Sequence, residues 1–460
     1  MDKNIKNIFF LGIGGIGMSA LAKYFHAKGY IVSGYDKTST PLTKSLEQQG
    51  IKIHFTDDEK NIPNEIKNNS LESLIVITPA IPKESIELNF FLQNNFTLIK
   101  RAAILGEITK GANTIAVAGT HGKTTTSTLV AHLMKEGEVD CSAFLGGISS
   151  NFNSNLLIGK DNCVVVEADE YDRSFLTLSP NTAIVTSVDP DHLDIYHEHK
   201  NLKESFELFT EKILANGNLI VKLNLDFTTR ENNSVKKYTY SIGGKSDFFA
   251  SDIQLIDGLY LFTLNTPSGK IENLELGMAG LHNLENAIAA SAAALLNGIS
   301  SENLKNGLKT FRGVKRRFEY IFRNQKLVYL DDYAHHPEEL LKCIESVKTI
   351  FPNKKITGIF QPHLFSRTRD FMDDFAKSLS MLDKCILLDI YPAREIPIPG
   401  ITSDLLLAKI TSPVKEKMYL NNIVNELDFF DTEVLLTLGA GDIDTIVEPL
   451  KQTLINYFKN

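Results

Sequence analysis

The sequence predicts an α/β protein with three domains in series, and three observations support this fold class. The chain has 460 residues, which corresponds to about three average domains. Short apolar runs recur along it and end in glycine or polar residues before a segment with helical periodicity. Over residues 216–280 such runs follow one another without helices, which favours an antiparallel patch inside the middle domain.

The first domain opens with a strand, a glycine turn and a helix. The sequence "GIGGIG" contains Gly12, Gly14, Gly15 and Gly17 and matches the G-x-G-x-x-G pattern. Such a turn lets a pyrophosphate approach the backbone at a helix N-terminus. A second run, "IVSGYD", ends in Asp36, where dinucleotide-binding domains place a ribose-binding acid. The turn by itself leaves open whether the ligand is a nicotinamide dinucleotide or another nucleotide diphosphate.

The most specific motif is "AVAGTHGKTTT", in which an apolar strand runs into a glycine-containing loop and then a helix. Backbone N–H groups of such a loop converge on phosphate oxygens. Lys123 would reach the β- and γ-phosphates, and the hydroxyl of Thr124 would bind magnesium. The loop is a variant of G-x-x-x-x-G-K-[ST], because Val117 stands where the pattern requires glycine. The residues expected to contact ATP here are Gly119, Thr120, His121, Gly122, Lys123, Thr124 and Thr125.

A magnesium nucleotide also needs a carboxylate ligand, and two acidic stretches follow predicted strands. The stretch "VVVEADEYD" places Glu167 at the end of an apolar run, the position of a Walker-B-type acid. Asp169, Glu170 and Asp172 in the same stretch are alternatives. The stretch "SVDPDHLD" places His192 among acidic residues, which makes it a further candidate for the metal site.

These motifs assign a fold to each domain. We expect residues 1–108 to form a Rossmann-like domain, 109–312 a central P-loop ATPase α/β domain that carries the antiparallel patch, and 313–460 a second Rossmann-like domain. In the third domain, runs such as "KLVYLDDY" and "KITGIFQPH" end in polar residues. Ligands of open parallel sheets bind beyond the carboxyl ends of the strands, so a further site is expected there.

Composition limits the possible partners. The net charge of −8 and the pI near 5.8 argue against affinity for nucleic acid or for an anionic membrane. The four cysteines are too far apart in sequence for a C-x-x-C pair, and we expect reduced thiols. Apolar runs stay below the roughly 18 residues of a membrane span, and the run near the N-terminus is too short for a secretory signal. We therefore expect a cytoplasmic protein.

The order of the motifs resembles that of the Mur ligase family. The matching stretches are "GIGGIGMSALA", "GTHGKTTT", "EADEYDRSF", "DPDHLD", "GLHNLENAIAA", "KRRFE", "DDYAHHPEE", "QPHLFSRT" and "LGAGD". The resemblance covers residues 8 to 450 and implies an ATP-dependent ligase that forms an amide through an acyl phosphate. It implies an N-terminal domain for a UDP-sugar, a central ATP domain, and a C-terminal domain that binds the amino acid and closes over ATP.

The resemblance also implies roles for residues in the phosphate and metal sites. Lys123 and Thr124 resemble the family's phosphate-loop lysine and magnesium-binding hydroxyl. Glu167 resembles the acid on the first magnesium, and His192 the histidine near the second. The implied metal residues are therefore Thr124, Glu167 and His192, and the implied catalytic residues are Lys123, Glu167, His192, Arg317 and His335.

Further roles fall on the other substrates. Asn283 and Asn286 look like adenine-side asparagines, Arg317 like a γ-phosphate contact, and Asp332 like a ribose contact. The implied amino-acid residues are Tyr333, His335, His363 and Arg367. In this family the glycine turn holds the diphosphate of a UDP-sugar, so the implied sugar-nucleotide residues are Gly12, Gly14, Gly15, Gly17, Asp36 and Thr78.

Within the family, the motifs favour the enzymes that join L-alanine to UDP-N-acetylmuramate, with ATP and Mg²⁺. The nearest alternative is a ligase that attaches a recycled tripeptide to the same sugar nucleotide. A nicotinamide-dependent oxidoreductase would explain the glycine turn but leave the GTHGKT loop unused, and a non-catalytic nucleotide-binding regulator would not need the acids. The sequence leaves open a monomer or a homodimer, and whether Lys200, Lys203 or Lys212 is carbamylated.

Overall fold

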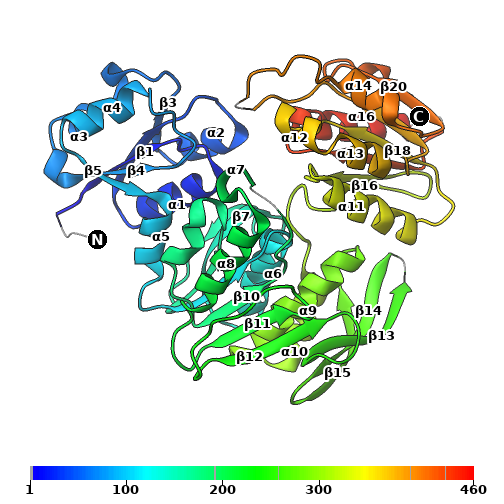
Figure 1. The fold of residues 1–460 in the computed structure, drawn as a ribbon, viewed down its shortest axis with the longest axis horizontal. Coiled ribbons are helices and arrows are strands. Elements are labelled where there is room, and N and C mark those ends of the chain that lie inside the picture. The colour runs from blue at the N-terminus through cyan, green and yellow to red at the C-terminus, as the bar shows by residue number, and fades with distance from the viewer. Residues whose placement is uncertain (1–3, 191–192, 257, 394, 430, 460) are drawn as a thin grey trace. The chain divides into compact units, whose positions relative to one another are not determined.

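A computed structural model describes residues 4–190, 193–256, 258–393, 395–429 and 431–459. Its strands form three sheets of five, ten and six strands, which follow one another along the chain (Figure 1). The predicted fold class, α/β with three sheet-based parts in series, is confirmed. The chain forms two compact units, one of residues 1–254, 261–277 and 285–312 and one of residues 255–260, 278–284 and 313–460.

The first sheet is entirely parallel and has the order β3-β2-β1-β4-β5. Its strands are β1 (Asn7–Leu11), β2 (Ile31–Tyr35), β3 (Lys52–His54), β4 (Ser73–Ile77) and β5 (Thr97–Lys100). The helical segments around it are α1 (Ile16–Ala27), α2 (Pro41–Gln48), η1 (Glu59–Asn61), α3 (Asn64–Lys67), η2 (Ser70–Glu72), α4 (Ile86–Gln93) and α5 (Arg101–Thr109). Because the strands are parallel, the segments that follow them all start at one edge of the sheet.

Helix α1 forms because its apolar residues recur at helical spacing. Met18, Leu21, Ala22 and Phe25 are at most 2% exposed and belong to the core of this part of the chain. The helix ends at Ala27 and is capped by Lys28, and the following Gly29 has φ of +87°, a left-handed conformation that glycine adopts without a steric penalty. The N-terminus of the helix directly follows the glycine turn, because Gly15 is its N-terminal cap.

The second sheet has the order β15-β14-β13-β12-β11-β10-β6-β9-β7-β8. The strands are β6 (Asn113–Ala118), β7 (Ser142–Ser149), β8 (Ser154–Leu157), β9 (Cys163–Glu167), β10 (Thr182–Val185), β11 (Asn218–Lys222), β12 (Lys236–Ser241), β13 (Phe248–Ile256), β14 (Leu259–Thr266) and β15 (Gly269–Leu276). The helical segments are α6 (Lys123–Glu136), η3 (Tyr171–Thr177), α7 (Leu193–Tyr196), α8 (His199–Thr210), α9 (Leu281–Leu296) and α10 (Ser301–Thr310).

The antiparallel part of this sheet is smaller than the patch predicted for residues 216–280. Strand β11 pairs in parallel with β10, and β12 pairs in parallel with β11. Residues 223–235 connect the end of β11 to the start of β12 without a helix. This loop is long enough for the crossover that a parallel pair of strands needs. Strands β14 and β15 are neighbours joined by residues 267 and 268 alone, so this pair is an antiparallel hairpin.

The third sheet has the order β16-β17-β21-β18-β19-β20, and all of its pairs are parallel except β16 with β17. Its strands are β16 (Glu319–Arg323), β17 (Val328–Asp332), β18 (Ile356–Phe360), β19 (Lys384–Leu387), β20 (Val414–Lys417) and β21 (Val434–Leu438). Its helical segments are α11 (Pro337–Ile350), α12 (Phe365–Asp370), α13 (Met372–Leu379), α14 (Ser403–Lys409), α15 (Ile423–Glu426), η4 (Asp442–Ile446) and α16 (Val447–Tyr457).

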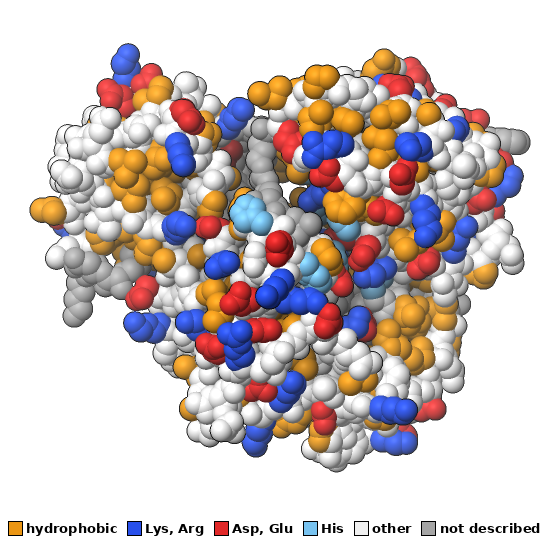
Figure 2. Space-filling model, viewed as in Figure 1, with side chains coloured by type: hydrophobic (Ala, Val, Ile, Leu, Met, Phe, Trp, Pro, Cys, Tyr) orange, Lys and Arg blue, Asp and Glu red, His pale blue; other side chains and the backbone are white. Residues whose placement is uncertain are grey.

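Surface and thiol properties follow from this packing. The face in Figure 2 intersperses lysine and arginine with aspartate and glutamate. The four cysteines are buried free thiols, and burial raises the pKa of Cys141 to about 12 and of Cys163 to about 11. In the part of the chain that the structure describes, no helix has the length and apolar character needed to cross a bilayer.

Asn155 fastens helix α1 to the second sheet. It lies at 0% exposure in β8, and its amide donates to the carbonyl of Ile16 at 2.7 Å and to the hydroxyl of Ser19 at 3.0 Å. Its side-chain oxygen accepts a hydrogen bond from Nζ of Lys23 at 3.0 Å. Within the first compact unit, the glycine-turn helix is therefore anchored to the sheet that carries the phosphate loop.

We expect Asn155→Ala to destabilise the first compact unit. The change removes three hydrogen-bond partners of buried or half-buried groups, and an unpaired buried polar group costs about 1–3 kcal/mol. The measurement is the thermal unfolding midpoint, with Asn94→Ala as the control, because the exposed Asn94 amide makes one hydrogen bond to Phe90. Equal midpoints for the two variants would show that the anchor contributes nothing.

Candidate nucleotide and substrate sites

The glycine turn of the first sheet is shaped by contacts with the neighbouring strands. The N–H of Gly12 donates to the carbonyl of Tyr35 at 2.8 Å, and the N–H of Gly14 donates to Oδ2 of Asp36 at 2.7 Å. A Cβ on Gly14 would lie 2.7 Å from Cγ2 of Thr43 and 2.8 Å from Oδ2 of Asp36. A side chain at position 14 would therefore displace Thr43 or the Asp36 carboxylate. Asp36 holds the turn through its bond to the N–H of Gly14, and its ligand role stays a prediction.

The predicted sugar-nucleotide residues come together at the carboxyl edge of this sheet. Cγ2 of Thr78, just after β4, lies 3.1 Å from the place of a Cβ on Gly12. Gly15 caps α1, and its N–H donates to the carbonyl of Gly12 at 3.2 Å. Thr78, Asp36 and the glycines thus surround the N-terminus of α1, where a phosphate is stabilised by free N–H groups.

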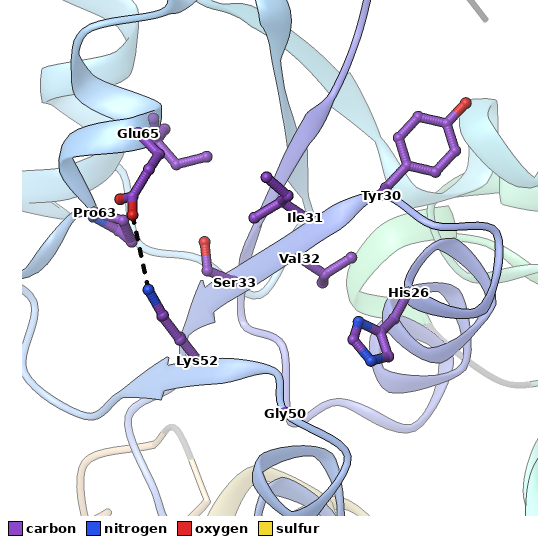
Figure 3. A pocket seen from close by; sticks show the side chains of 10 residues that line it. His26, Tyr30, Ile31, Val32, Ser33, Gly50, Lys52, Pro63 and Glu65 are labelled. Carbon is purple, nitrogen blue, oxygen red and sulfur yellow. Dashed lines mark ion pairs between the residues drawn. The ribbon is translucent and has the colours of Figure 1, made fainter.

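A pocket of 210 Å³ lies at the opposite, amino end of the same strands (Figure 3). Ile31 and Lys52, which begin β2 and β3, line it, and Figure 3 shows Lys52 pointing toward Glu65, with 3.8 Å between the charged atoms. None of the predicted site residues lines this pocket.

The phosphate loop joins β6 to α6 and contains two glycines in left-handed conformations. Gly119 has φ of +140°, and a Cβ there would lie 2.0 Å from Oγ1 of Thr186. Gly122 has φ of +80° and caps α6, and a Cβ there would lie 2.6 Å from Oδ1 of Asn286. The contact with Gly122 brings Asn286, a predicted ATP residue from α9, against the loop. The other predicted asparagine, Asn283, donates to the carbonyl of Ala279 at 2.6 Å.

Residues just after β10 hold the loop from one side. The carbonyl of Ser187 accepts the N–H of Thr120 at 3.1 Å, and its hydroxyl accepts the N–H of His121 at 2.7 Å. The hydroxyl of Thr120 accepts the N–H of Asp189 at 3.1 Å. Sequence reasoning did not single out Thr186 or Ser187, although their place at a strand end was a usable signal.

Lys123, the first residue of α6, is held at the base of the loop. Its Nζ donates to the carbonyl of Gly119 at 2.6 Å and to Oε1 of Glu170 at 2.7 Å. Burial lowers the pKa of Lys123, but the carboxylates of Glu170, Asp169 and Glu167 outweigh burial and raise its pKa above the ordinary value. An ammonium group has three donors, so one remains for a phosphate oxygen.

The acidic residues at and after the end of β9 have different contacts. Glu170, at 0% exposure, pairs directly with Lys123. Glu167 ends β9, lies opposite Val117 of β6 in the parallel register, and accepts the N–H of Gly146 on Oε2 at 3.1 Å. Sequence reasoning preferred Glu167 and kept Glu170 as an alternative. The predicted metal and catalytic residue His192 lies outside the described residues.

The oxygen atoms around the loop suit magnesium. Thr124, at 7% exposure, starts α6 beside Lys123, and the Glu167 carboxylate ends the adjacent strand. Carboxylate and hydroxyl oxygens are hard ligands of the kind that Mg²⁺ binds. The donor set therefore fits a magnesium nucleotide.

In the second compact unit, four aromatic and imidazole rings form a cluster, which we call the ring cluster: Tyr333, His335, His363 and Tyr391. The rings of Tyr333 and His335 are 5.3 Å apart, those of His335 and His363 5.8 Å, and those of His363 and Tyr391 5.7 Å. Three of these residues were predicted amino-acid residues. Tyr391 was missed, although it is the last residue of the predicted strand "KCILLDIY".

Arg367, the fourth predicted amino-acid residue, lies on α12, four residues after His363. Its Nη1 is buried, and the described residues provide it with no hydrogen-bond partner. A buried guanidinium N–H without an acceptor is costly unless a ligand supplies one. This nitrogen is thus suited to a carboxylate.

Arginines support Tyr333 and the acids at the end of β17. The guanidinium groups of Arg316 and Arg317 lie 5.2 and 5.1 Å from the ring centre of Tyr333. Arg316 also pairs with the buried Asp331 at 3.2 Å and was missed by sequence reasoning. Asp332 accepts the N–H groups of Phe318 and Ala334 at 2.7 and 2.8 Å. Burial raises the pKa of Asp332 to about 6, although Arg317 partly opposes the rise.

Comparison with known proteins identifies the class of protein. Three family models match in order: "Mur ligase family, catalytic domain" over residues 7–113, "Mur ligase middle domain" over 117–294 and "Mur ligase, glutamate ligase domain" over 316–441. The chain belongs to the Mur ligase family.

Particular relatives are similar over nearly their whole length. The UDP-N-acetylmuramate–L-alanine ligase of Porphyromonas gingivalis is 52% identical over 98% of this chain and 99% of that protein. The enzyme of the same name from Parabacteroides distasonis is 48% identical over 99% of this chain and 98% of that protein. The solved UDP-N-acetylmuramate–alanine ligase of Thermotoga maritima has a TM-score of 0.83 at 26% identity and covers 98% of this chain and 99% of that one. A murein peptide ligase from Psychrobacter arcticus, with a TM-score of 0.71 at 24% identity over 98% and 99% of the chains, shares the fold.

The raised pKa of Asp332 predicts a pH-dependent stability. The folded state, with a pKa of about 6, holds this proton more tightly than the unfolded chain, whose aspartates titrate near about 4. The stabilisation is therefore complete below about pH 4 and is lost as the pH rises through about 6. Asp332→Asn, which cannot titrate, should raise the unfolding midpoint relative to wild type more at about pH 7.5 than at about pH 4.5. The exposed Asp374→Asn is the control, and a difference that does not vary with pH would contradict the assignment.

Proposed function

We propose that this chain joins L-alanine to the lactyl carboxylate of UDP-N-acetylmuramate, with cleavage of ATP to ADP and phosphate. The observation that carries the proposal is the 52% identity, over 98% of the chain, with a UDP-N-acetylmuramate–L-alanine ligase. The strand, glycine loop and lysine-bearing helix of the central sheet support the use of ATP, because this arrangement binds nucleotide phosphates.

The proposed reaction has two steps. A carboxylate oxygen of the sugar nucleotide attacks the γ-phosphorus of ATP, ADP leaves, and an acyl phosphate forms. The amine of L-alanine then attacks the acyl carbon, and phosphate leaves with formation of the amide. Phosphoryl transfer depends mainly on positioning and charge neutralisation, so the protein needs no nucleophile of its own.

In this proposal, Lys123 directs its third N–H toward the transferring phosphoryl group while Gly119 and Glu170 hold the other two. Thr124 and Glu167 would hold Mg²⁺, which neutralises charge on the phosphate oxygens when it is bound. Roles of His192 near the metal, of Asn283 and Asn286 beside adenine, of Arg317 at the γ-phosphate and of Asp332 at the ribose rest on the resemblance to the family.

The amino acid is proposed to bind at the ring cluster and Arg367. The buried Nη1 of Arg367 would donate a hydrogen bond to the incoming carboxylate. Tyr333, whose ring lies close to the guanidinium groups of Arg316 and Arg317, would close the side-chain end of the site. A small pocket of this kind favours L-alanine, although one methyl group is worth only about 1–3 kcal/mol against glycine.

The same geometry fits a ligase that adds a recycled tripeptide, because solved murein peptide ligases share the fold. The deciding experiment incubates the protein with Mg-ATP, UDP-N-acetylmuramate, and L-alanine or L-alanyl-γ-D-glutamyl-diaminopimelate in competition. Phosphate release and product mass are measured. Preferential ligation of L-alanine supports the proposal, and faster ligation of the tripeptide overturns it. We also propose a monomer or homodimer acting on these small molecules.

Replacing Lys123 should abolish most activity. We expect Lys123→Met to lower kcat by about 100-fold or more, because it removes a charge that stabilises the transition state. Lys135→Met on the same helix is the matched control, since Lys135 forms an exposed pair with Asp140. The double variant Lys123→Met/Glu170→Gln leaves no unpaired buried charge, so it should regain stability without regaining activity. Near-normal turnover in the double variant would remove Lys123 from the reaction.

Arg367→Lys should weaken the use of the amino acid selectively. A point charge cannot replace a planar, bidentate guanidinium, so we expect KM for L-alanine to rise about tenfold or more while KM for ATP is unchanged. Arg369→Lys on the same helix is the control, because Arg369 is half-exposed and paired with Asp370. Equal rises in both KM values would argue against a carboxylate contact.

A further inference from the structure

Arg101 occupies a position that neither the motifs nor the family roles assigned. It is the first residue of α5 and directly follows β5. Strands β1, β4 and β5 are parallel neighbours, so their carboxyl ends meet at the same edge of the first sheet. Arg101 therefore starts at the edge that also carries the glycine turn after β1 and Thr78 after β4.

The guanidinium group lies against the first turn of α1. A Cβ on Gly17 would stand 2.4 Å from Nη1 of Arg101, so the absence of a side chain at position 17 makes room for the guanidinium. Ile16 begins the helix, which puts Gly17 at the end where free N–H groups and the helix dipole attract a phosphate. Gly17, the last glycine of the G-x-G-x-x-G pattern, thus admits a cation at the proposed diphosphate site.

The other end of the guanidinium is fixed by the central sheet. Nη2 of Arg101 donates to Oδ2 of Asp169 at 2.9 Å, and Oδ1 of Asp169 accepts the N–H of Tyr171 at 3.1 Å. Asp169 precedes Glu170, the partner of Lys123. Arg101, Asp169, Lys123 and Glu170 therefore alternate in charge from the glycine turn to the phosphate loop.

The guanidinium remains accessible to a ligand. The side chains of Arg101 and Asp169 are 26% and 33% exposed, so neither is sealed in the core. A guanidinium carries five N–H donors in a plane, and pairing through Nη2 leaves donors at Nε and Nη1. Planar donors of this kind bind phosphate oxygens in pairs.

We propose that Arg101 binds the diphosphate of the nucleotide sugar, with Asp169 as the positioning residue that holds the guanidinium toward the glycine turn. This role rests on the proposed function, because it assigns a further contact to the same sugar nucleotide. Asp169 contacts no substrate in this proposal and acts only through Arg101.

A neighbouring ion pair supplies the matched control. Lys100 pairs with Asp172 at 2.9 Å and so connects the same two segments, but Lys100 is 62% exposed. Lys100→Met removes a link between these segments without touching the glycine turn. If Arg101 acted only by linking these two segments, Lys100→Met would also weaken binding of the sugar nucleotide.

The test is isothermal titration calorimetry of the full chain with UDP-N-acetylmuramate and with UDP-N-acetylglucosamine, which has the diphosphate but no lactyl carboxylate. For Arg101→Met we expect Kd to rise about tenfold or more for both ligands, with a small change in Lys100→Met. Arg101→Lys should recover part of the affinity, and Asp169→Asn should raise Kd severalfold. In steady-state assays, Arg101→Met should raise KM for UDP-N-acetylmuramate and leave KM for ATP unchanged.

Unchanged affinity in both Arg101 variants would overturn the role of Arg101 while leaving the proposed function intact. A loss for UDP-N-acetylmuramate alone would also overturn it, because the contact would then be with the carboxylate. If Arg101→Met does not fold, Arg101→Lys and Asp169→Asn decide by the same criteria. Failure of the wild-type chain to bind UDP-N-acetylmuramate would instead overturn the proposed function.

Discussion

The central site depends on keeping the charge of Lys123 in a largely buried position. An ammonium group removed from water is stable only when carboxylates and carbonyls replace its hydration. The structure meets this requirement with Glu170 at 2.7 Å and the carbonyl of Gly119 at 2.6 Å. The second contact requires the loop to turn back on itself, which the left-handed Gly119 and Gly122 permit. The conformation of the loop and the charge of the lysine are thus mutually dependent.

The glycines of both nucleotide motifs mark places where another group approaches the backbone. Thr186 stands where a side chain on Gly119 would be, Asn286 does so at Gly122, and Arg101 at Gly17. A motif read from sequence shows that such a position must be empty of side chain. Which group fills the space is decided by a distant segment, and at Gly17 that group is a cation.

Much of the fold was predictable because the spacing of apolar residues in the sequence indicates strands and helices with strong local periodicity. The predicted strand before the glycine turn forms β1, the run that ends in Glu167 forms β9, and the run "KLVYLDDY" contains β17. The antiparallel patch was predicted too broadly, since the sequence of β11 and β12 is compatible with either direction and loop 223–235 sets it. The ring cluster was largely predictable because its members follow parallel strands, whose carboxyl ends converge.

The sequence by itself determined the order of the motifs, the positions of the two phosphate-binding turns and the family, because these depend on residue types at fixed short spacings. The tertiary structure decided the partners. Glu170 lies 2.7 Å from Nζ of Lys123 because the turn after β9 brings it back to the loop, whereas Glu167 still belongs to β9 and accepts the N–H of Gly146. The pairing of Arg101 with Asp169 joins residues 68 positions apart. Such contacts are set by how sheets and helices pack, and local sequence carries no record of that packing.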